Sequence, residues 1–278
     1  MIEIQEPPDA EEFFRQAADF LLAKEAENSL MLGLATDLGR TPAPERVPHR
    51  LWVVRYQGAV LGAAIWTPPF PVVLTGMPGE ALGELLDQIQ TEGLDVPGFS
   101  APFETAEAAA RYWCGLRDKR FRLSLGLTLY RLRSVKTFDP PSGAPRPALP
   151  AEVGRMAEWH QALNQEAGMD DHLDSLALMA AYQGESRLWV WDDRGVSAMA
   201  GFSGFTPTGV RISAVYTPPD KRRKGYAAAL TAALCQNLLA RGRAQCFLFA
   251  DRENETANRV YLKVGFEPVG DWAMMKFL

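Results

Sequence analysis

A proline-rich run at residues 139–150 divides this chain of 278 residues into two parts of similar length. The run reads D-P-P-S-G-A-P-R-P-A-L-P, and its five prolines supply no backbone donors to a helix or a sheet. Such a composition is typical of a stiff, extended linker. The sequence therefore predicts one domain at 1–138 and a second at 151–278, which fits a length of about 150 residues per domain.

The two parts share a weak internal repeat at an offset of 137 residues. The triplet L-W-V at 51–53 aligns with L-W-V at 188–190, and Gly58 aligns with Gly195. In both copies an alternating apolar segment runs into a glycine turn and a second apolar segment, a pattern that predicts a β-hairpin. The order of the elements around each hairpin also matches, which favours a duplicated α/β unit.

Periodicity predicts the remaining elements. The first part has helical patterns at 10–26, 80–90 and 104–116 and strand patterns at 72–75 and 122–132. The second part has helical patterns at 151–165, 226–240 and 255–264 and strand patterns at 210–216, 245–250 and 272–277. Alternation of strands with helices predicts an α/β (α+β) fold with a helix-covered sheet in each part.

Composition argues against several classes of protein. The formal net charge is −5, and neither part has the basic excess that nucleic-acid binding requires. Three cysteines without a C-x-x-C pair, and three scattered histidines, argue against a disulfide framework and a metal site. The first residues are acidic and no stretch reaches about 18 apolar residues, so we expect neither a signal peptide nor a membrane span, and a reducing, cytoplasmic location.

The segment from 210 to 230 carries the strongest chemical signal. A strand ends near Tyr216, two prolines follow, and the basic run R-R-K-G at 222–225 leads directly into a helix. The first N–H groups of that helix have no intrahelical partner, and the helix dipole adds positive charge there. Gly225 allows a ligand to approach the backbone closely, so the turn predicts a diphosphate site. The alternative is a solvated basic turn before an ordinary helix.

A second signal follows at 254–266, N-E-T-A-N-R-V-Y-L-K-V-G-F. Asn254 can cap the start of a helix, and Ala257 and Tyr261 lie on one face of it. Gly265 can end the helix in a left-handed cap.

Together, R-x-x-G-x-A after a strand and N-x-x-A-x-x-x-Y-x-x-x-G-F on a later helix resemble the GNAT superfamily of acyl-CoA-dependent N-acyltransferases. The resemblance is strong over 151–278 and rests on element order alone over 1–135. It implies two tandem GNAT-like domains, each a twisted mixed sheet flanked by helices. It also implies acetyl-CoA as co-substrate, with no metal.

The resemblance implies a role for each residue of the two motifs. The turn would bind the pyrophosphate of coenzyme A, the strand end would pair with the pantetheine arm, and the helix would contribute asparagines. The residues implied in cofactor binding are Val215, Tyr216, Thr217, Arg222, Arg223, Lys224, Gly225, Tyr226, Ala227, Asn254, Asn258 and Tyr261. For Asn254, a plain helix cap is compatible with this role.

The implied catalytic groups are an acid and a base. Tyr261 would act as general acid on the departing thiolate, because a phenol with a pKa near 10 suits that transfer. The alternative is a core tyrosine that anchors the helix. The backbone N–H of Val215 would polarise the thioester carbonyl. The strand before the turn lacks the glutamate that many GNAT enzymes use as a base. Glu166 or Asp170 could serve through water, as could Asp171 or His172, and Tyr216 and Ser213 are possible relays; a solvated acidic loop is the alternative.

The first part lacks these features. Its counterpart of the turn, around 72–83, has no Arg or Lys beside its glycines, and Glu80 and Glu84 would repel phosphate. We therefore predict a degenerate N-terminal domain that neither binds acyl-CoA nor transfers acyl groups.

The sequence thus predicts an N-acetyltransferase that moves an acetyl group from acetyl-CoA to a primary amine by direct attack. The alternatives are a non-catalytic acyl-CoA-binding module or sensor, and an enzyme with a non-amine acceptor. The expected partner is a small-molecule amine, with no nucleic acid and no membrane. The oligomeric state cannot be inferred from the residues.

Overall fold

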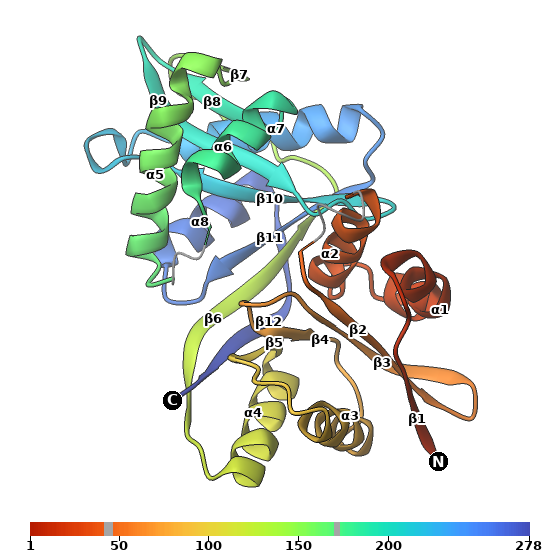
Figure 1. Ribbon diagram of the computed structural model, residues 1–278. Coiled ribbons are helices and arrows are strands. Elements are labelled where there is room, and N and C mark those ends of the chain that lie inside the picture. Colours follow the sequence, from red (N-terminus) through yellow and green to blue (C-terminus); the bar gives the residue numbers. More distant parts are fainter. Residues whose placement is uncertain (42–46, 170–172) are drawn as a thin grey trace. The chain divides into compact units, whose positions relative to one another are not determined.

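The computed structural model describes residues 1–41, 47–169 and 173–278, which form two compact units (Figure 1). Unit 1 consists of Met1–Leu129, Gly204–Thr206 and Val269–Leu278, and unit 2 of Tyr130–Ser203 and Pro207–Pro268. The units therefore exchange segments across the sequence boundaries at 138 and 151. Both are mixed sheets flanked by helices, which confirms the predicted α/β class.

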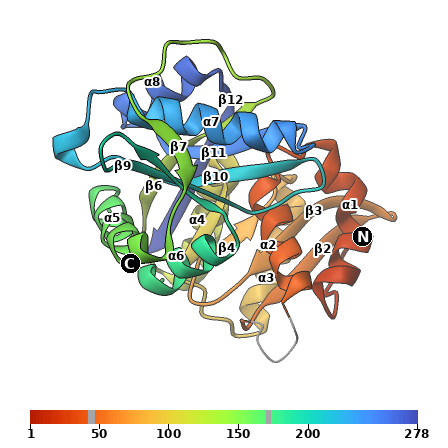
Figure 2. The same cartoon turned by 90° about the horizontal axis from the view of Figure 1, so that it is seen from above.

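Unit 1 is built on the strand order β1-β2-β3-β4-β5-β12. These strands are β1 (Ile2–Gln5), β2 (Arg50–Tyr56), β3 (Ala59–Trp66), β4 (Val72–Leu74), β5 (Gly98–Pro102) and β12 (Glu267–Phe277). Neighbours pair antiparallel except β4 and β5, which are parallel. Helices α1 (Ala10–Ala23) and α2 (Ser29–Arg40) pack together, as do α3 (Gly79–Thr91) and α4 (Phe103–Arg117), on opposite faces of the sheet (Figures 1 and 2).

Helix α1 shows how local sequence produces these elements. The side chain of Asp9 accepts a hydrogen bond from the backbone N–H of Glu12 at 2.9 Å and so caps the helix start. Phe13, Ala17 and Leu21 recur every four residues, share one face and are fully buried.

The core of unit 1 includes a side chain from the last strand. The Phe99 ring of β5 lies 5.8 Å from the Trp113 ring of α4 and 5.4 Å from the Phe277 ring of β12. Phe99 and Trp113 are fully buried, and edge-to-face contacts of this kind add to the burial of apolar area. Strand β12 therefore completes the core that β5 and α4 begin.

Unit 2 has the strand order β6-β11-β10-β9-β8-β7, with β10 and β11 parallel. Its strands are β7 (Ala144–Pro147), β8 (Leu188–Asp192), β9 (Val196–Ser203), β10 (Gly209–Tyr216) and β11 (Gln245–Asp251); β6 (Phe121–Leu132) enters from unit 1. Helices α5 (Val153–Glu166) and α6 (Ser175–Gly184) pack together on one face, and α7 (Tyr226–Ala240) and α8 (Glu255–Val264) on the other (Figure 2).

Strand β7 lies within the run that the sequence predicts as a linker. It pairs antiparallel with β8, with Arg146 opposite Val190. Pro145 and Pro147 are two residues apart, so both ring nitrogens face away from β8, as an edge strand permits. The N–H of Ala148, which points the other way, donates to Leu188 O at 2.9 Å.

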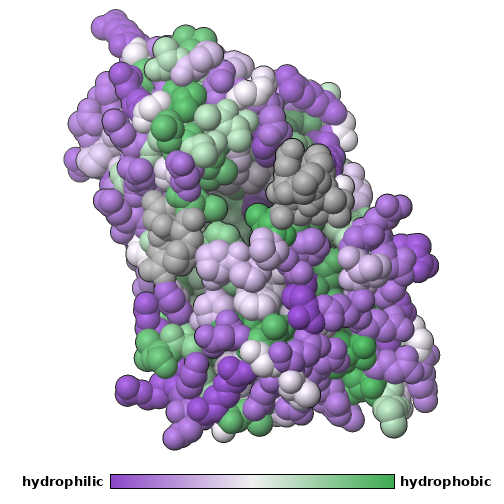
Figure 3. Space-filling model, viewed as in Figure 1, coloured by the Kyte–Doolittle hydropathy of each residue, from purple (hydrophilic) through white to green (hydrophobic). Residues whose placement is uncertain are grey.

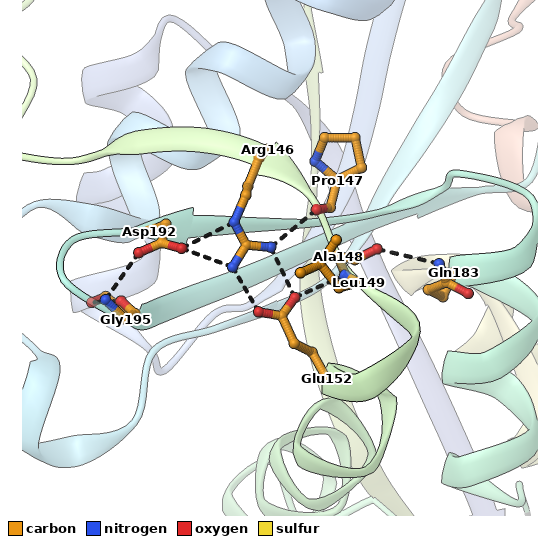
Figure 4. Close-up of polar contacts among 9 residues, drawn as sticks. Arg146, Pro147, Ala148, Leu149, Glu152, Gln183, Asp192 and Gly195 are labelled. Atoms are coloured by element: carbon orange, nitrogen blue, oxygen red, sulfur yellow. Dashed lines mark hydrogen bonds and ion pairs between the residues drawn. The ribbon is translucent and has the colours of Figure 1, made fainter.

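An ion-pair network holds this edge strand (Figure 4). The Arg146 guanidinium donates to both carboxylate oxygens of Glu152 at 2.6 and 2.9 Å, and to Asp192 at 2.8 and 3.0 Å. Glu152 lies in the short 3-10 turn η2 (Pro150–Glu152), and Asp192 ends β8. The network therefore links β7 to the element after it and to its neighbour strand.

Most predicted elements are confirmed, among them both hairpins, α7 and α8. The sequence did not predict β1, α2, β5, β7 or α6. Hydrophilic side chains cover most of the face seen in Figure 3, and hydrophobic ones are interspersed among them in small groups. In the described part of the chain, no helix is long and apolar enough to cross a membrane.

Candidate active site

The end of β10 departs from regular strand geometry. Its parallel register with β11 covers residues 209–211 against 245–247. On its other side, the pairing with β9 shifts register between Ser213 and Tyr216, and Ala214 adopts a left-handed φ of 50°. Such a bulge re-aims the strand and releases backbone groups from the ladder. The segment 215–217 that was predicted to meet the pantetheine arm therefore lies beyond the registered pairs with β11.

The turn after β10 leads into an uncapped helix start. A 3-10 turn, η3 (Pro219–Lys221), is followed by Arg223 with φ 64° and Gly225 with φ 84°. Gly225 is the N-cap of α7, and no side chain caps that end. Glycine suits this position because a left-handed φ costs it nothing. The first N–H groups of α7 are thus available to an anion, with the exposed Arg223 and Lys224 beside them.

The Tyr226 side chain is hydrogen-bonded to Asp193, whereas the resemblance implied a role in cofactor binding. Its hydroxyl donates to Asp193 Oδ2 at 2.5 Å, and Ser142 donates to the same oxygen at 2.8 Å. The bond to Asp193 raises the pKa of Tyr226, and the two donors lower the pKa of Asp193. Tyr226 therefore offers a ligand its backbone N–H, as does the half-buried Ala227.

Arg222 is bound to a residue predicted to be catalytic. Its guanidinium donates to both oxygens of Glu166 at 2.7 and 2.8 Å, and its Nε donates to Thr217 O at 2.8 Å. Tyr216 donates its hydroxyl to Glu166 Oε1 at 3.0 Å. Burial and the nearby Glu166 carboxylate raise the pKa of Tyr216. The structure thus brings the end of α5 together with the turn, which no local pattern could indicate.

The two asparagines of α8 have different surroundings. Asn254 accepts from the N–H of Ala257 at 3.0 Å, which confirms its role as the helix cap. Asn258 accepts from the hydroxyl of Tyr130 at 3.0 Å and donates to the carbonyls of Asp251 and Arg252 at 3.0 and 3.3 Å. Asn258 therefore ties α8 to β6 and β11, and Tyr130 is a partner that the sequence did not suggest.

Tyr261 lies on the buried face of α8. Its ring is 6.2 Å from that of Tyr130 and 5.9 Å from that of Phe266. Burial, and to a lesser extent the Cys235 thiol and the Tyr130 phenol, raises the pKa of Tyr261 from its usual 10 to about 12. None of the described residues accepts a hydrogen bond from its hydroxyl. Tyr261 therefore keeps its proton at neutral pH.

Some candidates for the general base lie outside the described residues, and others lie within them. Asp170, together with Asp171 and His172, lies outside them. Glu166 is exposed and paired as above. His160 is buried, with its Nδ1 2.8 Å from Ser175 Oγ, so it serves the packing of α5 against α6. No group of three or more His, Cys, Asp or Glu able to hold a metal occurs among residues 1–41, 47–169 and 173–278.

The corresponding segment of unit 1 is shorter, and its Met77 side chain packs against the strand β3. Only residues 75–78 separate β4 from α3, and Glu80 lies in the first turn of α3. The Met77 side chain packs so closely on Gly62 that a Cβ there would meet it at 2.7 Å. The buried Thr75 hydroxyl accepts from the N–H of Ala63 at 2.9 Å. No basic turn precedes α3, in agreement with the charge pattern of the sequence.

One known protein family matches the part of the chain that contains this turn. Residues 193–273, which include the turn and α8, match the family described as FR47-like protein. No curated protein sequence matches the chain.

Solved structures match along the full length. A GCN5-related N-acetyltransferase from Sphaerobacter thermophilus is 16% identical, with a TM-score of 0.64 over 99% of this chain and 95% of that one. A Drosophila protein is 11% identical, with a TM-score of 0.72 over 99% and 98%. A tandem GNAT protein from the clavulanic acid biosynthesis pathway is 15% identical, with a TM-score of 0.58 over 100% and 98%. These identities establish a shared fold, and the resemblance to GNAT proteins is confirmed at that level.

Proposed function

Starting from the GNAT acetyltransferase fold, we propose that this chain is an N-acetyltransferase that moves an acetyl group from acetyl-CoA to a primary amine. The C-terminal half would carry the site. The observation that supports this most is the uncapped start of α7 at Gly225, which follows the turn after β10, a strand that leaves its register with β11. A diphosphate would accept from the N–H groups of Gly225, Tyr226 and Ala227.

The proposed reaction needs two proton movements. The neutral amine attacks the thioester carbonyl, a C–N bond forms, and the C–S bond breaks as the thiolate leaves. The N–H of Val215 would stabilise the oxyanion. The pKa of Tyr261, about 12, keeps its phenol protonated, so it would donate a hydrogen bond to the departing sulfur. Glu166 or Asp170 would accept the amine proton through water.

We propose the cofactor's remaining contacts from the same residues. The pantetheine arm would pair with Val215 and Thr217, and Asn254 could add a hydrogen bond. Arg223 and Lys224 would neutralise phosphate charge from the rim of the turn. The proposed partner is a small-molecule amine. We place the protein in the cytoplasm, supported by its three free, buried cysteines.

A non-catalytic acyl-CoA-binding module is the second candidate, because β10 carries no acidic residue. Turnover that depends on Tyr261 would separate the two. We also propose that the N-terminal half is degenerate, supported by the short, Met77-filled connection before α3.

The proposed function is tested by calorimetric titration with acetyl-CoA. We expect one site per chain, lost in Gly225→Glu, because a carboxylate would then occupy the anion site. Gly242→Glu is the matched control: it lies just beyond the other end of α7, its φ is 91°, and the space around it is open. Two sites per chain would show that the first half also binds. Absence of binding in the unmodified protein would refute the acyltransferase proposal.

A further inference from the structure

The Arg222 guanidinium pairs with the Glu166 carboxylate and lies over the ring of Tyr216. The Trp159 ring lies beside the Tyr216 ring, and all four residues belong to unit 2. The Arg222 Cζ lies 5.5 Å from the centre of the Tyr216 ring, and the Trp159 ring lies 6.1 Å from that same ring. A carboxylate beside aromatic faces is a general recognition site for ammonium and guanidinium groups.

The site is fixed by its own contacts. Tyr216 is buried and donates to Glu166 Oε1 at 3.0 Å, which orients the carboxylate. Trp159 and Glu166 lie two turns apart on α5, so one helix sets both positions relative to β10. The side chains of Glu166 and Arg222 are 47% and 41% exposed, so solutes can reach the ion pair.

Arg222 is also the first residue of the turn that would bind the cofactor diphosphate. Its guanidinium cannot donate all of its hydrogen bonds to a phosphate while both Glu166 oxygens accept from it. An exposed ion pair of this kind contributes little net stability, so its partners can be exchanged at small cost. A diphosphate held by the start of α7 carries more charge than one carboxylate, so it can draw the guanidinium away.

We propose that Glu166, Tyr216 and Trp159 form the recognition site for the positively charged group of the acceptor. Arg222 occupies this site in the free protein, and cofactor binding vacates it. The inference rests on the proposed function and adds to it: the acceptor is a cationic amine, and its binding is coupled to that of the cofactor. Because such coupling is reciprocal, each ligand must tighten the other by the same factor.

The test is calorimetry with coenzyme A as the diphosphate probe and 1,4-diaminobutane as the cation probe. In the unmodified protein, we expect each probe to bind roughly 2–5-fold more tightly when the other is saturating, the factor that a broken exposed ion pair can supply. In Glu166→Gln, we expect diamine binding and the coupling to disappear, while coenzyme A binds roughly 2–5-fold more tightly because Arg222 is released. Glu158→Gln, an exposed position on the same helix, is the matched control and should behave like the unmodified protein.

Several results would overturn the inference. One is equal coenzyme A affinity in Glu166→Gln and the control; another is absent or uncoupled diamine binding in the unmodified protein. Either result, with coenzyme A binding intact, would leave the proposed function standing. If no variant bound coenzyme A, the proposed function would fail and this inference with it. A circular dichroism spectrum of Glu166→Gln that matches the control excludes misfolding as the cause.

Discussion

Trp272 donates its indole N–H to the hydroxyl of Ser100 at 2.9 Å, in the buried interior of unit 1. The two residues lie on adjacent strands, β12 and β5, whose antiparallel register runs from 272–276 against 98–102. The last strand of the chain therefore pairs with β5 in the sheet that the first residues begin.

We predict that this bond contributes to the stability of the fold. Trp272→Phe and Ser100→Ala should each lower the free energy of unfolding, by about 1–3 kcal/mol, because each leaves a buried polar group or loses packing. A double-mutant cycle in urea should give a coupling of about 0.5–1.5 kcal/mol. Strictly additive effects would show that the bond adds nothing.

The second prediction concerns the close approach of two glycines within unit 1. A Cβ on Gly33 of α2 would lie 2.7 Å from the Gly204 Cα. Gly33→Ala should therefore destabilise the protein by about 1–3 kcal/mol, although alanine favours a helix. Gly39→Ala is the control: it lies on the exposed side of α2, with its nearest neighbour 3.9 Å away, and should be neutral or stabilising. Thermal unfolding of both variants decides the matter, and equal melting temperatures would contradict the prediction.

The third prediction concerns the Arg146 network. Arg146→Met should cost about 1–3 kcal/mol, because it leaves two partly buried carboxylates without their cation. The guanidinium holds the pKa of Glu152 below its usual 4.5 and that of Asp192 below 3.8. Their contribution is therefore present above about pH 4.5 and is lost as the pH falls through the lowered values.

Urea unfolding at pH 6 and pH 3 measures this contribution. The loss of stability on acidification should be smaller in Arg146→Met than in the unmodified protein. Arg155→Met, an exposed position on α5, should show the full loss. An equally large acid loss in Arg146→Met would contradict the assignment.

The fourth prediction concerns Tyr261. Tyr261→Phe should lower turnover roughly 10²–10⁴-fold, the usual contribution of a positioned proton donor. Since burial raises its pKa to about 12, ionisation of Tyr261 should not limit the rate below about pH 11. Tyr56→Phe, at an exposed position, is the control and should leave turnover unchanged. A steady-state pH profile of each variant tests both statements.

The same shift affects stability at high pH. The unfolded phenol ionises near pH 10 and the folded one near 12, so the unfolded state binds fewer protons in this window. The stabilising contribution is full below pH 10 and is lost as the pH rises towards 12, by an amount on the order of 2–3 kcal/mol. Tyr261→Phe should show a smaller alkaline loss in urea unfolding than Tyr56→Phe.

The sequence predicted most accurately the helices whose ends are marked by a capping residue or a glycine. Helices α7 and α8 have their predicted bounds, because Gly225, Asn254 and Gly265 mark their termini. Helix α2 was missed because its start has no side-chain cap and two glycines interrupt it. Strand β7 was missed because the two prolines seemed to exclude a strand, and only an edge position accommodates them.

The sequence predicted which residues the candidate site contains, but it did not predict which of them contact one another. The turn and Tyr261 came from motifs, but the ion pair between Glu166 and Arg222 joins α5 to a turn distant in sequence. Which carboxylate an arginine reaches depends on how helices pack, which local patterns do not encode. The pKa of Tyr261 likewise depends on its burial and, to a lesser extent, on the nearby Cys235 thiol and Tyr130 phenol, which lie on other elements.

The place of β12 beside β5 also affects how this protein is made. While the ribosome adds the residues after Pro102, β5 has its partner β4 on one side and an open hydrogen-bonding edge on the other. At about 5–20 residues per second, the strand that covers that edge emerges roughly 10–30 s later. During this interval, the nascent first sheet exposes an edge of the kind that invites pairing between chains. The edge of β5 is protected from such pairing only once residues 272–276 have paired with residues 98–102.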